Sequence, residues 1–509
     1  MLRDLRQQAD LGNGMYKNPV IFTGGDNSTL KDGDDYYMTF GMGGPCGCAI
    51  YHSRDLVNWE FLYYAVTNFT GRLWAPDLIK YGDTYYIYAF LATEDPHWNY
   101  GDVYVTTMKD IKHGPWTEPT VVYKNIPSID PGHVVGEDGK RYIFMSQNMY
   151  FPLSDDGLKA TGHYKIIYPD WPIPDKWDVE GMCTEGPKLL WKDGWLYLTT
   201  AQGGTLGPPT SHMVVSLRSR SVHGPWEFSP YNAIKHTDSR DEYWWSKGHG
   251  TLVLGPDNEQ WYLLYGGFPR GHRATCGKAT LLEPVIWDED GWWRVDPKYK
   301  EDEPIPMPKG GEKVNSEYHL SDDFTKETEL RPHWMPSDTT TVKERVSFDK
   351  DGLTLIGVGS HLMDSHPIMM QRQHISQEIT VELFSEYHAI SGICFGTPFG
   401  NYMNPDLGTL CGIAVEQDII KVYNNNARWM QVREHYVKNE KADWSGNHIW
   451  LKLKNDKDII SPWYSYDGVN WKTINMCFDV NDWFGLKCGF FCAGHGSATF
   501  KSFTYNALD

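Results

Sequence analysis

Five stretches in the N-terminal part of the chain repeat one pattern, and this repeat limits the possible folds more than any other feature. Each copy opens with a polar residue, continues as a short strand, turns at Asp, Gly or Asn, and begins a second strand with aromatic residues. The copies read GGDNSTLKDGDDYYMTF, WAPDLIKYGDTYYIYAF, SIDPGHVVGEDGKRYIFM, CTEGPKLLWKDGWLYLTT and KGHGTLVLGPDNEQWYLLYGG. A repeat of about 50 residues that holds four strands is typical of a β-propeller blade. The pattern therefore predicts a five-bladed β-propeller.

The polar residues that open the five copies form a second signal. They are Asp26, Asp77, Asp130, Glu185 and His249. In a propeller the innermost strand of every blade lines the central channel, so equivalent positions of the copies point at one axis. We expect these carboxylates and the histidine to meet at one mouth of the channel, although they lie far apart in the sequence.

The composition changes after the repeats. Residues 301–316 are rich in Pro, Gly and charge, and they are predicted to form a linker or a crossing strap. Residues 317–509 contain alternating segments such as GLTLIGVG and IWLKLKND, which indicate a second all-β unit of the jelly-roll β-sandwich type. We thus expect an all-β chain with a propeller in residues 1–300 and a β-sandwich in residues 317–509.

Charge and hydropathy narrow the class of partner. The 509 residues carry a formal net charge of −19, which disfavours nucleic acid and anionic membranes, while aromatic residues make up 14% and suit the flat faces of sugar rings. No stretch reaches the ~18 apolar residues of a membrane helix. The beginning, MLRDLRQQADLGNG, has no apolar run, so no signal peptide is expected, and both a cytoplasmic protein and a chain without its signal stay open. The oligomeric state also stays open.

Carboxyl groups that converge in an aromatic pocket suit the hydrolysis of glycosidic bonds. One carboxyl must keep its proton to protonate the leaving oxygen, and the other must be ionised to deprotonate a water. Like charges at close range push their pKa values apart, and apolar walls raise one of them further. Acids that face each other across a channel mouth leave room for a water, which favours inversion of the anomeric centre.

Several motifs resemble those of glycoside hydrolase family 43, whose members combine a five-bladed propeller with, in many cases, a C-terminal β-sandwich. In GGDNSTLKDGDDYY, Asp26 lies ten positions before Tyr36, as in the family's first motif. SIDPGHVV carries the family's Asp-Pro element, and TEGP is the most specific match. The resemblance implies that Asp26 is the general base, that Glu185 is the general acid, and that Asp130 tunes and orients Glu185.

The resemblance also implies roles for residues around these acids. Trp74 in RLWAPDL would line the sugar subsite, or it would belong to the core between blades. His249 in KGHGTLV would face a channel calcium or sodium ion held largely through water, or it would be a core histidine; no cofactor is implied for the chemistry. Further substrate contacts are expected at Asp77, which could instead cap a strand turn, and at Phe40, Gln202, Arg273 and Lys278. The last two are candidates because Gly-Lys-Ala-Thr stands where the family often has Gly-Arg-Glu-Thr.

The resulting hypothesis is an exo-acting, inverting glycoside hydrolase that releases terminal β-D-xylose or α-L-arabinofuranose from plant hemicellulose oligosaccharides or polysaccharides. One alternative is a carbohydrate-binding propeller without catalysis. Another is an endo-acting hydrolase of arabinan or another glycan with the same fold. A fructan- or sucrose-cleaving relative is a further alternative, although the first motif reads GGDNS rather than the Asn-Asp-Pro-Asn-Gly type of those enzymes.

Overall fold

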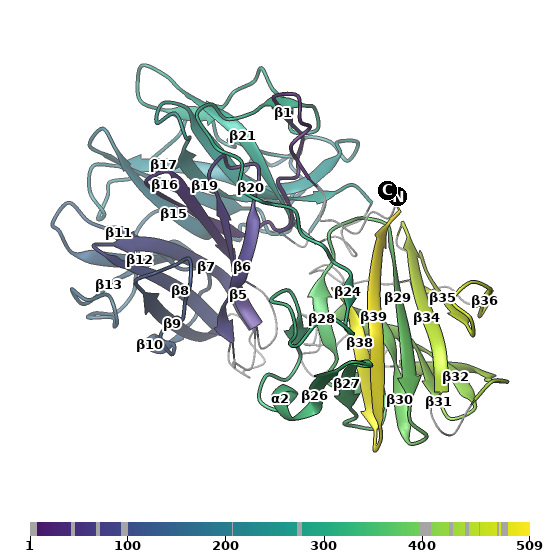
Figure 1. The fold of residues 1–509 in the computed structure, drawn as a ribbon. Coiled ribbons are helices and arrows are strands. Elements are labelled where there is room, and N and C mark those ends of the chain that lie inside the picture. The colour runs from purple at the N-terminus through teal and green to yellow at the C-terminus, as the bar shows by residue number, and fades with distance from the viewer. Residues whose placement is uncertain are drawn as a thin grey trace. The chain divides into compact units, whose positions relative to one another are not determined.

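The chain forms two units of β-structure (Figure 1). The first contains residues 8–271 and 278–316, and the second contains residues 317–509. In this computed structural model the described residues are 8–41, 46–67, 72–92, 100–205, 207–271, 277–397, 409–426, 431–442, 447–457, 459–475, 478–479 and 487–508.

The first unit is the predicted five-bladed propeller. In each blade the strands are antiparallel neighbours. The first blade consists of β3 (Asn27–Asp32), β4 (Asp35–Phe40), β5 (Cys46–Ser53) and β6 (Glu60–Thr67). The second consists of β7 (Arg72–Tyr81), β8 (Thr84–Ala92), β9 (Gly101–Met108) and β10 (Thr120–Ile126). The third consists of β11 (Gly132–Val135), β12 (Arg141–Met145), β13 (Met149–Pro152) and β14 (Lys165–Ile166). The fourth consists of β15 (Glu185–Lys192), β16 (Trp195–Gln202), β17 (Met213–Ser219) and β18 (Glu227–Phe228).

The fifth blade closes the ring with a strand from near the start of the chain. Its strands are β19 (Trp244–Leu254), β20 (Trp261–Pro269), β21 (Ala279–Trp287), β22 (Trp293–Val295) and β2 (Ile21–Gly24). Ile21 of β2 pairs with Thr280 of β21, and the Val20 amide donates to the Thr280 carbonyl at 2.9 Å. A sheet shared by the two ends of a propeller holds the ring shut.

Residues 301–316, predicted as a linker or a crossing strap, belong to the first unit. Within them β23 (Ile305–Pro306) pairs with β1 (Met15–Tyr16), and the Met307 amide donates to the Gly14 carbonyl at 3.0 Å. Ser316 donates through its hydroxyl to the side chain of Gln8 at 2.8 Å. This segment therefore runs along the propeller as a strap rather than as a free spacer.

Aromatic residues fill the space between blades, which explains why the second strand of each repeat opens with them. Tyr37 of β4 is 2% exposed, and its ring meets that of Tyr85 of β8 edge to face with the centroids 6.1 Å apart. Such a pair contributes about 0.5–1.5 kcal/mol beyond the burial of its area. Among the described residues each blade forms a sheet of its own, so side chains of this kind hold neighbouring blades together.

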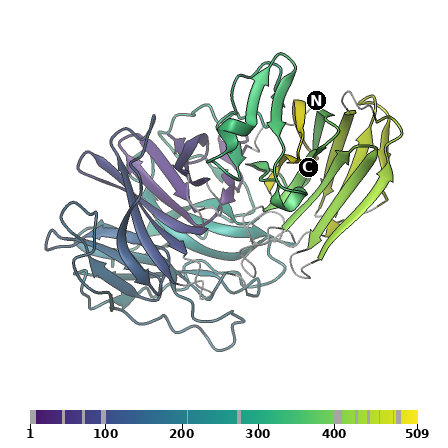
Figure 2. The same ribbon diagram turned by 90° about the horizontal axis from the view of Figure 1, so that it is seen from below.

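The second unit contains two antiparallel sheets, and its long strands lie alongside one another in Figure 2. The first sheet consists of β24 (Asp322–Asp323), β26 (Val346–Asp349), β27 (Gly352–Ile356), β29 (Gln377–Ser385), β34 (Asn447–Asp456), β35 (Ile459–Ser465), β36 (Trp471–Thr473), β37 (Phe478–Asp479) and β39 (Ser497–Ala507). The second consists of β25 (Met335–Pro336), β28 (Ile368–Gln371), β30 (Ala389–Thr397), β31 (Thr409–Glu416), β32 (Ile419–Asn426), β33 (Gln431–Lys438) and β38 (Lys487–Gly494). Two single turns of helix, α2 (Val342–Arg345) and η1 (Leu362–Asp364), accompany them.

The core of the second unit lies between its two sheets, as expected for a sandwich. Along β29 buried and partly exposed residues alternate without a break, which puts Ile379, Val381 and Leu383 on the inner face. They share one apolar cluster with Ile393 and Phe395 of the opposite sheet. The alternation of apolar and polar residues along the sequence of β29 therefore determines which face of the strand is buried.

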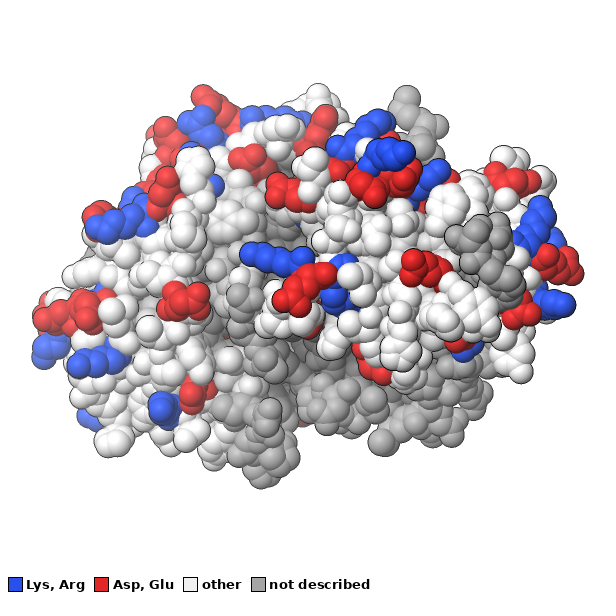
Figure 3. Space-filling view, turned by 60° about the horizontal axis from the view of Figure 1, so that its bottom comes forward, with Lys and Arg blue, Asp and Glu red and all other residues white. Residues whose placement is uncertain are grey.

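The surface carries its charge in a dispersed form. Over the described residues of the face in Figure 3, acidic and basic side chains are interspersed without a large area of one sign. Among the described residues, none of the helices has the length and apolar character needed to cross a membrane.

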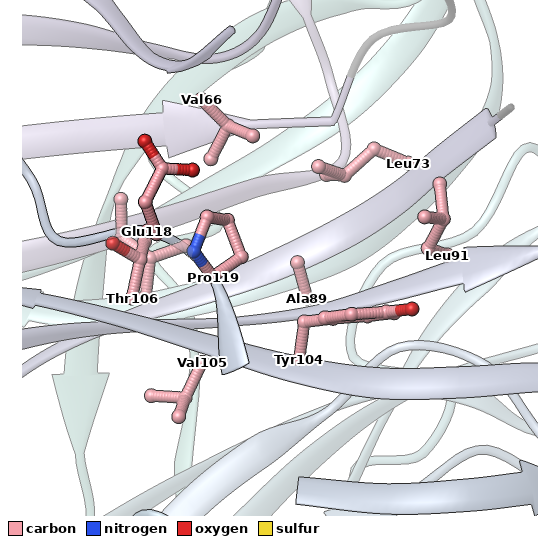
Figure 4. A pocket seen from close by; sticks show the side chains of 10 residues that line it. Val66, Leu73, Ala89, Leu91, Tyr104, Val105, Thr106, Glu118 and Pro119 are labelled. Carbon is pink, nitrogen blue, oxygen red and sulfur yellow. The ribbon is translucent and has the colours of Figure 1, made fainter. Parts of the chain in front are cut away.

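An apolar cavity of about 290 Å³ lies between the first and second blades (Figure 4). Its lining includes Val66, Leu73, Leu91 and Tyr104, with Glu118 as its charged residue. None of the predicted site residues lines it.

Candidate active site

The residues that open the five repeats lie on or next to the innermost strands. Asp26 immediately precedes β3, Asp130 precedes β11, and Glu185 is the first residue of β15. Asp77 lies within β7 and His249 within β19. The three predicted catalytic carboxyls lie within electrostatic range of one another, since the charges of Asp26 and Asp130 each raise the pKa of Glu185 and the charge of Asp26 raises the pKa of Asp130.

Asp26 is surrounded by cationic and imidazole groups. Lys278, just before β21, donates from Nζ to Asp26 Oδ1 at 2.6 Å, and His249 Nδ1 lies 3.5 Å from the same oxygen. Burial opposes the charge of Asp26, but the positive charge of Lys278 and its hydrogen bond outweigh burial and hold the pKa of Asp26 well below the usual value. Asp26 is therefore ionised at any pH near neutrality, which is the state that a general base requires.

Glu185 has the opposite surroundings. Its side chain is 17% exposed, and its Oε1 lies 3.5 Å from Nδ1 of His212, a fully buried residue just before β17. Burial raises the pKa of Glu185 well above its usual value, and the charges of Asp130 and Asp26 raise it further, although Lys278 partly opposes them. Glu185 therefore retains a proton under conditions in which Asp26 has none, as a general acid requires.

Asp130 is the third carboxyl of the set. It is 4% exposed, has a left-handed backbone with φ of 57°, and accepts a hydrogen bond from the Ser146 hydroxyl at 3.3 Å. Burial and the charge of Asp26 raise its pKa, while Lys188 and Lys278 oppose that rise. Asp130 and Glu185 therefore titrate as a linked pair, and the negative charge of one makes the other keep its proton.

Two glycines explain the local sequence around the acid and the histidine. The ring of His249 fills the place where a Cβ of Gly186 would stand, at 2.6 Å, and Gly186 has φ of 62°. In the same way the ring of His212 lies 1.9 Å from where a Cβ of Gly248 would stand. Only glycine fits either position. The Gly that follows Glu185 in TEGP is thus required by the packing of a histidine from the fifth blade.

His212 is a residue that the sequence analysis missed. It lies in the stretch SHMVV, between the predicted strands of one blade, and it does not open a repeat. The signal that could have identified it is its place directly before the apolar run MVV, which begins β17.

Three predicted substrate contacts have internal partners instead. Phe40 is 2% exposed, fills the space beside Gly24, and stacks on Tyr51. Gln202 is 1% exposed, and its amide group accepts from the backbone N–H of Trp171 at 3.1 Å and donates to its carbonyl at 2.7 Å. These contacts show how the two side chains are held in the propeller, and their expected contacts with sugar stay predictions.

Asp77 is the third such residue. It is 4% exposed, and its carboxylate is occupied by groups from neighbouring blades, so it too has an internal role. Trp74, on β7, is partly exposed and packs against the apolar cluster of the second and third blades. Arg273 lies outside the described residues.

A direct metal site does not emerge from these side chains. Over the described residues, no three His, Cys, Asp or Glu side chains come together in a way that could hold a metal ion. His249 is 1% exposed, and burial lowers its pKa to about 3, so its ring is neutral.

Comparison with known proteins gives one family. Residues 16–293 match the family model described as Glycosyl hydrolases family 43. The chain is 27% identical over 307 residues to Xylosidase/arabinosidase 43B of Humicola insolens, covering 55% of this chain and 54% of that protein. It is 30% identical over 334 residues to the non-reducing end alpha-L-arabinofuranosidase BoGH43B of Bacteroides ovatus, covering 62% of this chain and 59% of that protein. The chain thus matches little more than half the length of these relatives.

One solved structure resembles the chain over nearly its full length. The GH43 BlXynB protein from Bacillus licheniformis is 25% identical and superposes with a TM-score of 0.81, covering 97% of this chain and 100% of that one. The similarity includes the second unit as well as the propeller.

Proposed function

The chain belongs to family 43 of the glycosyl hydrolases, and from this premise we propose that it is an exo-acting, inverting hydrolase of terminal pentoses. The sugars would be β-D-xylose or α-L-arabinofuranose at the ends of hemicellulose oligosaccharides. One observation carries the proposal: the surroundings of Asp26 and Glu185 displace their pKa values in opposite directions within one site. Two carboxyls in opposite protonation states are what glycosidic hydrolysis needs.

The proposed reaction moves one proton at each end of the scissile bond. Glu185 donates its proton to the glycosidic oxygen as the bond to the anomeric carbon breaks. Asp26 takes a proton from a water whose oxygen attacks the anomeric carbon from the opposite face, which inverts its configuration. After product release Asp26 gives its proton to solvent and Glu185 takes one up, so no covalent intermediate and no net change of the enzyme is involved.

Asp130 and Lys278 support the two carboxyls in this scheme. The charge of Asp130 keeps the proton on Glu185, because ionising both in a buried site is costly. The ammonium of Lys278 keeps Asp26 ionised through the 2.6 Å contact. The names of the similar proteins, a xylosidase/arabinosidase and an arabinofuranosidase, are the support for a pentose.

A panel of four nitrophenyl glycosides tests the sugar specificity: β-xyloside, α-arabinofuranoside, α-arabinopyranoside and β-galactoside. We expect hydrolysis of the first or the second, and proton NMR should show the inverted anomer as the first product. A retained anomer would overturn the role of Asp26 as base. Activity on the galactoside alone would overturn the pentose assignment.

Product length separates this proposal from its alternatives. An exo-acting enzyme releases only monosaccharide from a xylo- or arabino-oligosaccharide at early times, whereas an endo-acting one releases shorter oligosaccharides. Calorimetric binding of these oligosaccharides without any product would instead indicate a carbohydrate-binding propeller.

A further inference from the structure

Asp77 joins four blades at the axis of the propeller. Its Oδ1 accepts from the Ser28 hydroxyl at 2.9 Å and from Lys188 Nζ at 3.0 Å, and its Oδ2 accepts from the backbone N–H of His133 at 2.7 Å. Ser28 belongs to the first blade, His133 to the third and Lys188 to the fourth, while Asp77 itself belongs to the second. Innermost strands from four sides of a ring can meet at one carboxylate only where the axis passes.

Lys188 provides the positive charge at this point. Its Nζ donates to Asp77 Oδ1 and to the Pro76 carbonyl at 2.9 Å, and the side chains of Lys188 and Asp77 are 7% and 6% exposed. A buried carboxylate without a counter-charge is strongly destabilising, so the ammonium stabilises the hub in this arrangement.

The acid next to His249 in the fifth blade is also paired with an ammonium group. His249 Nδ1 lies 3.5 Å from Asp26 Oδ1, and Lys278 Nζ donates to that same oxygen at 2.6 Å. The carboxylates of Asp26 and Asp77, which could attract a metal ion, are thus already neutralised by Lys278 and Lys188, and a further cation would be repelled by these ammonium groups. The hub accordingly does not fit the calcium or sodium ion that the family resemblance implies at His249.

We propose that the Lys188 ammonium is the axial cation of this propeller, so that the hub is held together by the ion pair between Lys188 and Asp77 and takes up no metal ion. The pair ties the four blades named above, and the Thr251 hydroxyl of the fifth blade donates to the Asn27 carbonyl of the first at 3.0 Å to complete the ring. This role concerns folding of the propeller and does not rest on the proposed reaction.

The unaltered protein gives the first test. Metal content is measured by mass spectrometry after dialysis, and thermal unfolding is followed in EDTA, in calcium chloride and in sodium chloride at matched ionic strength. We expect no stoichiometric calcium and the same Tm of the propeller transition in all three solutions. One calcium per chain, or a Tm that falls by several degrees in EDTA, would overturn the proposal.

Variants give the second test. Lys188→Met keeps the length of the side chain but leaves the buried carboxylate of Asp77 without its ammonium partner. We therefore expect it to lower Tm by about 10 °C. Adding Asp77→Asn to this variant should restore part of the loss, because no buried charge is then left unpaired. The matched control is Lys192→Met, which alters the same strand where Lys192 pairs with the exposed Asp193, and it should leave Tm within about 2 °C of the parent.

The two tests are read together. A Lys188→Met protein with the Tm of the parent would contradict the proposal. So would a double variant whose loss of Tm equals the sum of the losses in Lys188→Met and in Asp77→Asn alone. If Lys188→Met fails to fold, the metal content and EDTA response of the parent still decide the question, because they need no variant.

Discussion

Asp26 and Glu185 stand at the start of the innermost strands of the first and fourth blades, yet they meet different neighbours. On the Asp26 side the Lys278 ammonium lies 2.6 Å from a carboxylate that is 39% exposed. On the Glu185 side the His212 ring lies 3.5 Å from a carboxyl that is 17% exposed and feels the charge of Asp130. Equivalent places in a repeated fold thus acquire opposite protonation states because their neighbours differ.

The difference teaches where acid and base roles come from. Lys278 belongs to neither the first nor the fourth blade, because it lies just before β21 in the fifth. The protonation state of Asp26 thus depends on an ammonium group from a third blade. The four predictions below test the contrast between the Asp26 side and the Glu185 side.

The largest effect is expected on the Asp26 side. Asp26→Asn removes the group that deprotonates water, and it should lower kcat by about 10⁴-fold. Because the attacking water is needed for every substrate, the loss should be alike for nitrophenyl glycosides and for a natural disaccharide. Asp34→Asn, in the next turn of the same blade and with a side chain 82% exposed, is the control. A loss limited to the disaccharide would show that Asp26 acts on the leaving group.

Glu185→Gln should show the opposite dependence on substrate. A nitrophenolate leaves without protonation, so this variant should lose roughly 10-fold on nitrophenyl glycosides but about 10⁴-fold on the disaccharide. Both rates are measured on one preparation, together with those of Glu227→Gln, a half-exposed residue of the same blade. Equal losses on both substrates would exclude Glu185 as the general acid.

Lys278→Met should move both limbs of the pH profile in the same direction. Without the ammonium the pKa of Asp26 rises, so the acidic limb moves to higher pH. The pKa of Glu185 also rises, because Lys278 lowers it in the parent, and the alkaline limb moves to higher pH as well. Profiles of kcat/KM should show about a 10-fold loss on the acidic side. Lys300→Met, with an exposed side chain, is the control, and limbs that move apart would refute this account.

The smallest effect concerns stability. The pKa of Glu185 is raised by folding, so the folded state binds its proton more tightly than the unfolded state does. Its stabilising contribution is complete below the unfolded pKa and is lost as the pH rises through the folded pKa. Glu185→Gln should therefore have a Tm equal to the parent in acid and higher by about 2–4 °C in alkali. Folding lowers the pKa of Asp26, so its stabilising contribution is instead lost as the pH falls. A Tm of Glu185→Gln above that of the parent in acid would contradict the assignment.

The repeat made the propeller predictable, but it hid the residues that connect one blade to another. Five copies gave five blades, and their opening residues gave the converging carboxyls. Lys188 could not be recognised, because in TEGPKLL it looks like any lysine of a half-buried strand and its partner Asp77 belongs to another copy. His212 was missed because it opens no repeat, although its partner Glu185 does. The hydrogen bonds of the Gln202 amide could not be foreseen, because their partner Trp171 lies in a segment that no periodicity marks.

The alternation of buried residues made the second unit predictable as a sandwich, since a period of two specifies a face without any knowledge of partners. The strap formed by residues 301–316 was less visible. Its backbone pairs with β1 over only two residues, and the Pro and Gly content that suggested a linker is equally compatible with a chain that lies flat on a surface.

The pairing of β2 with β21 has a consequence for synthesis of the protein. Ile21 leaves the ribosome long before Thr280, its partner in the fifth blade, has been translated. The nascent chain must therefore carry an unpaired strand while four blades are completed, and such edges attract other chains. Chaperones that cover short apolar segments would protect this strand until the ring can close.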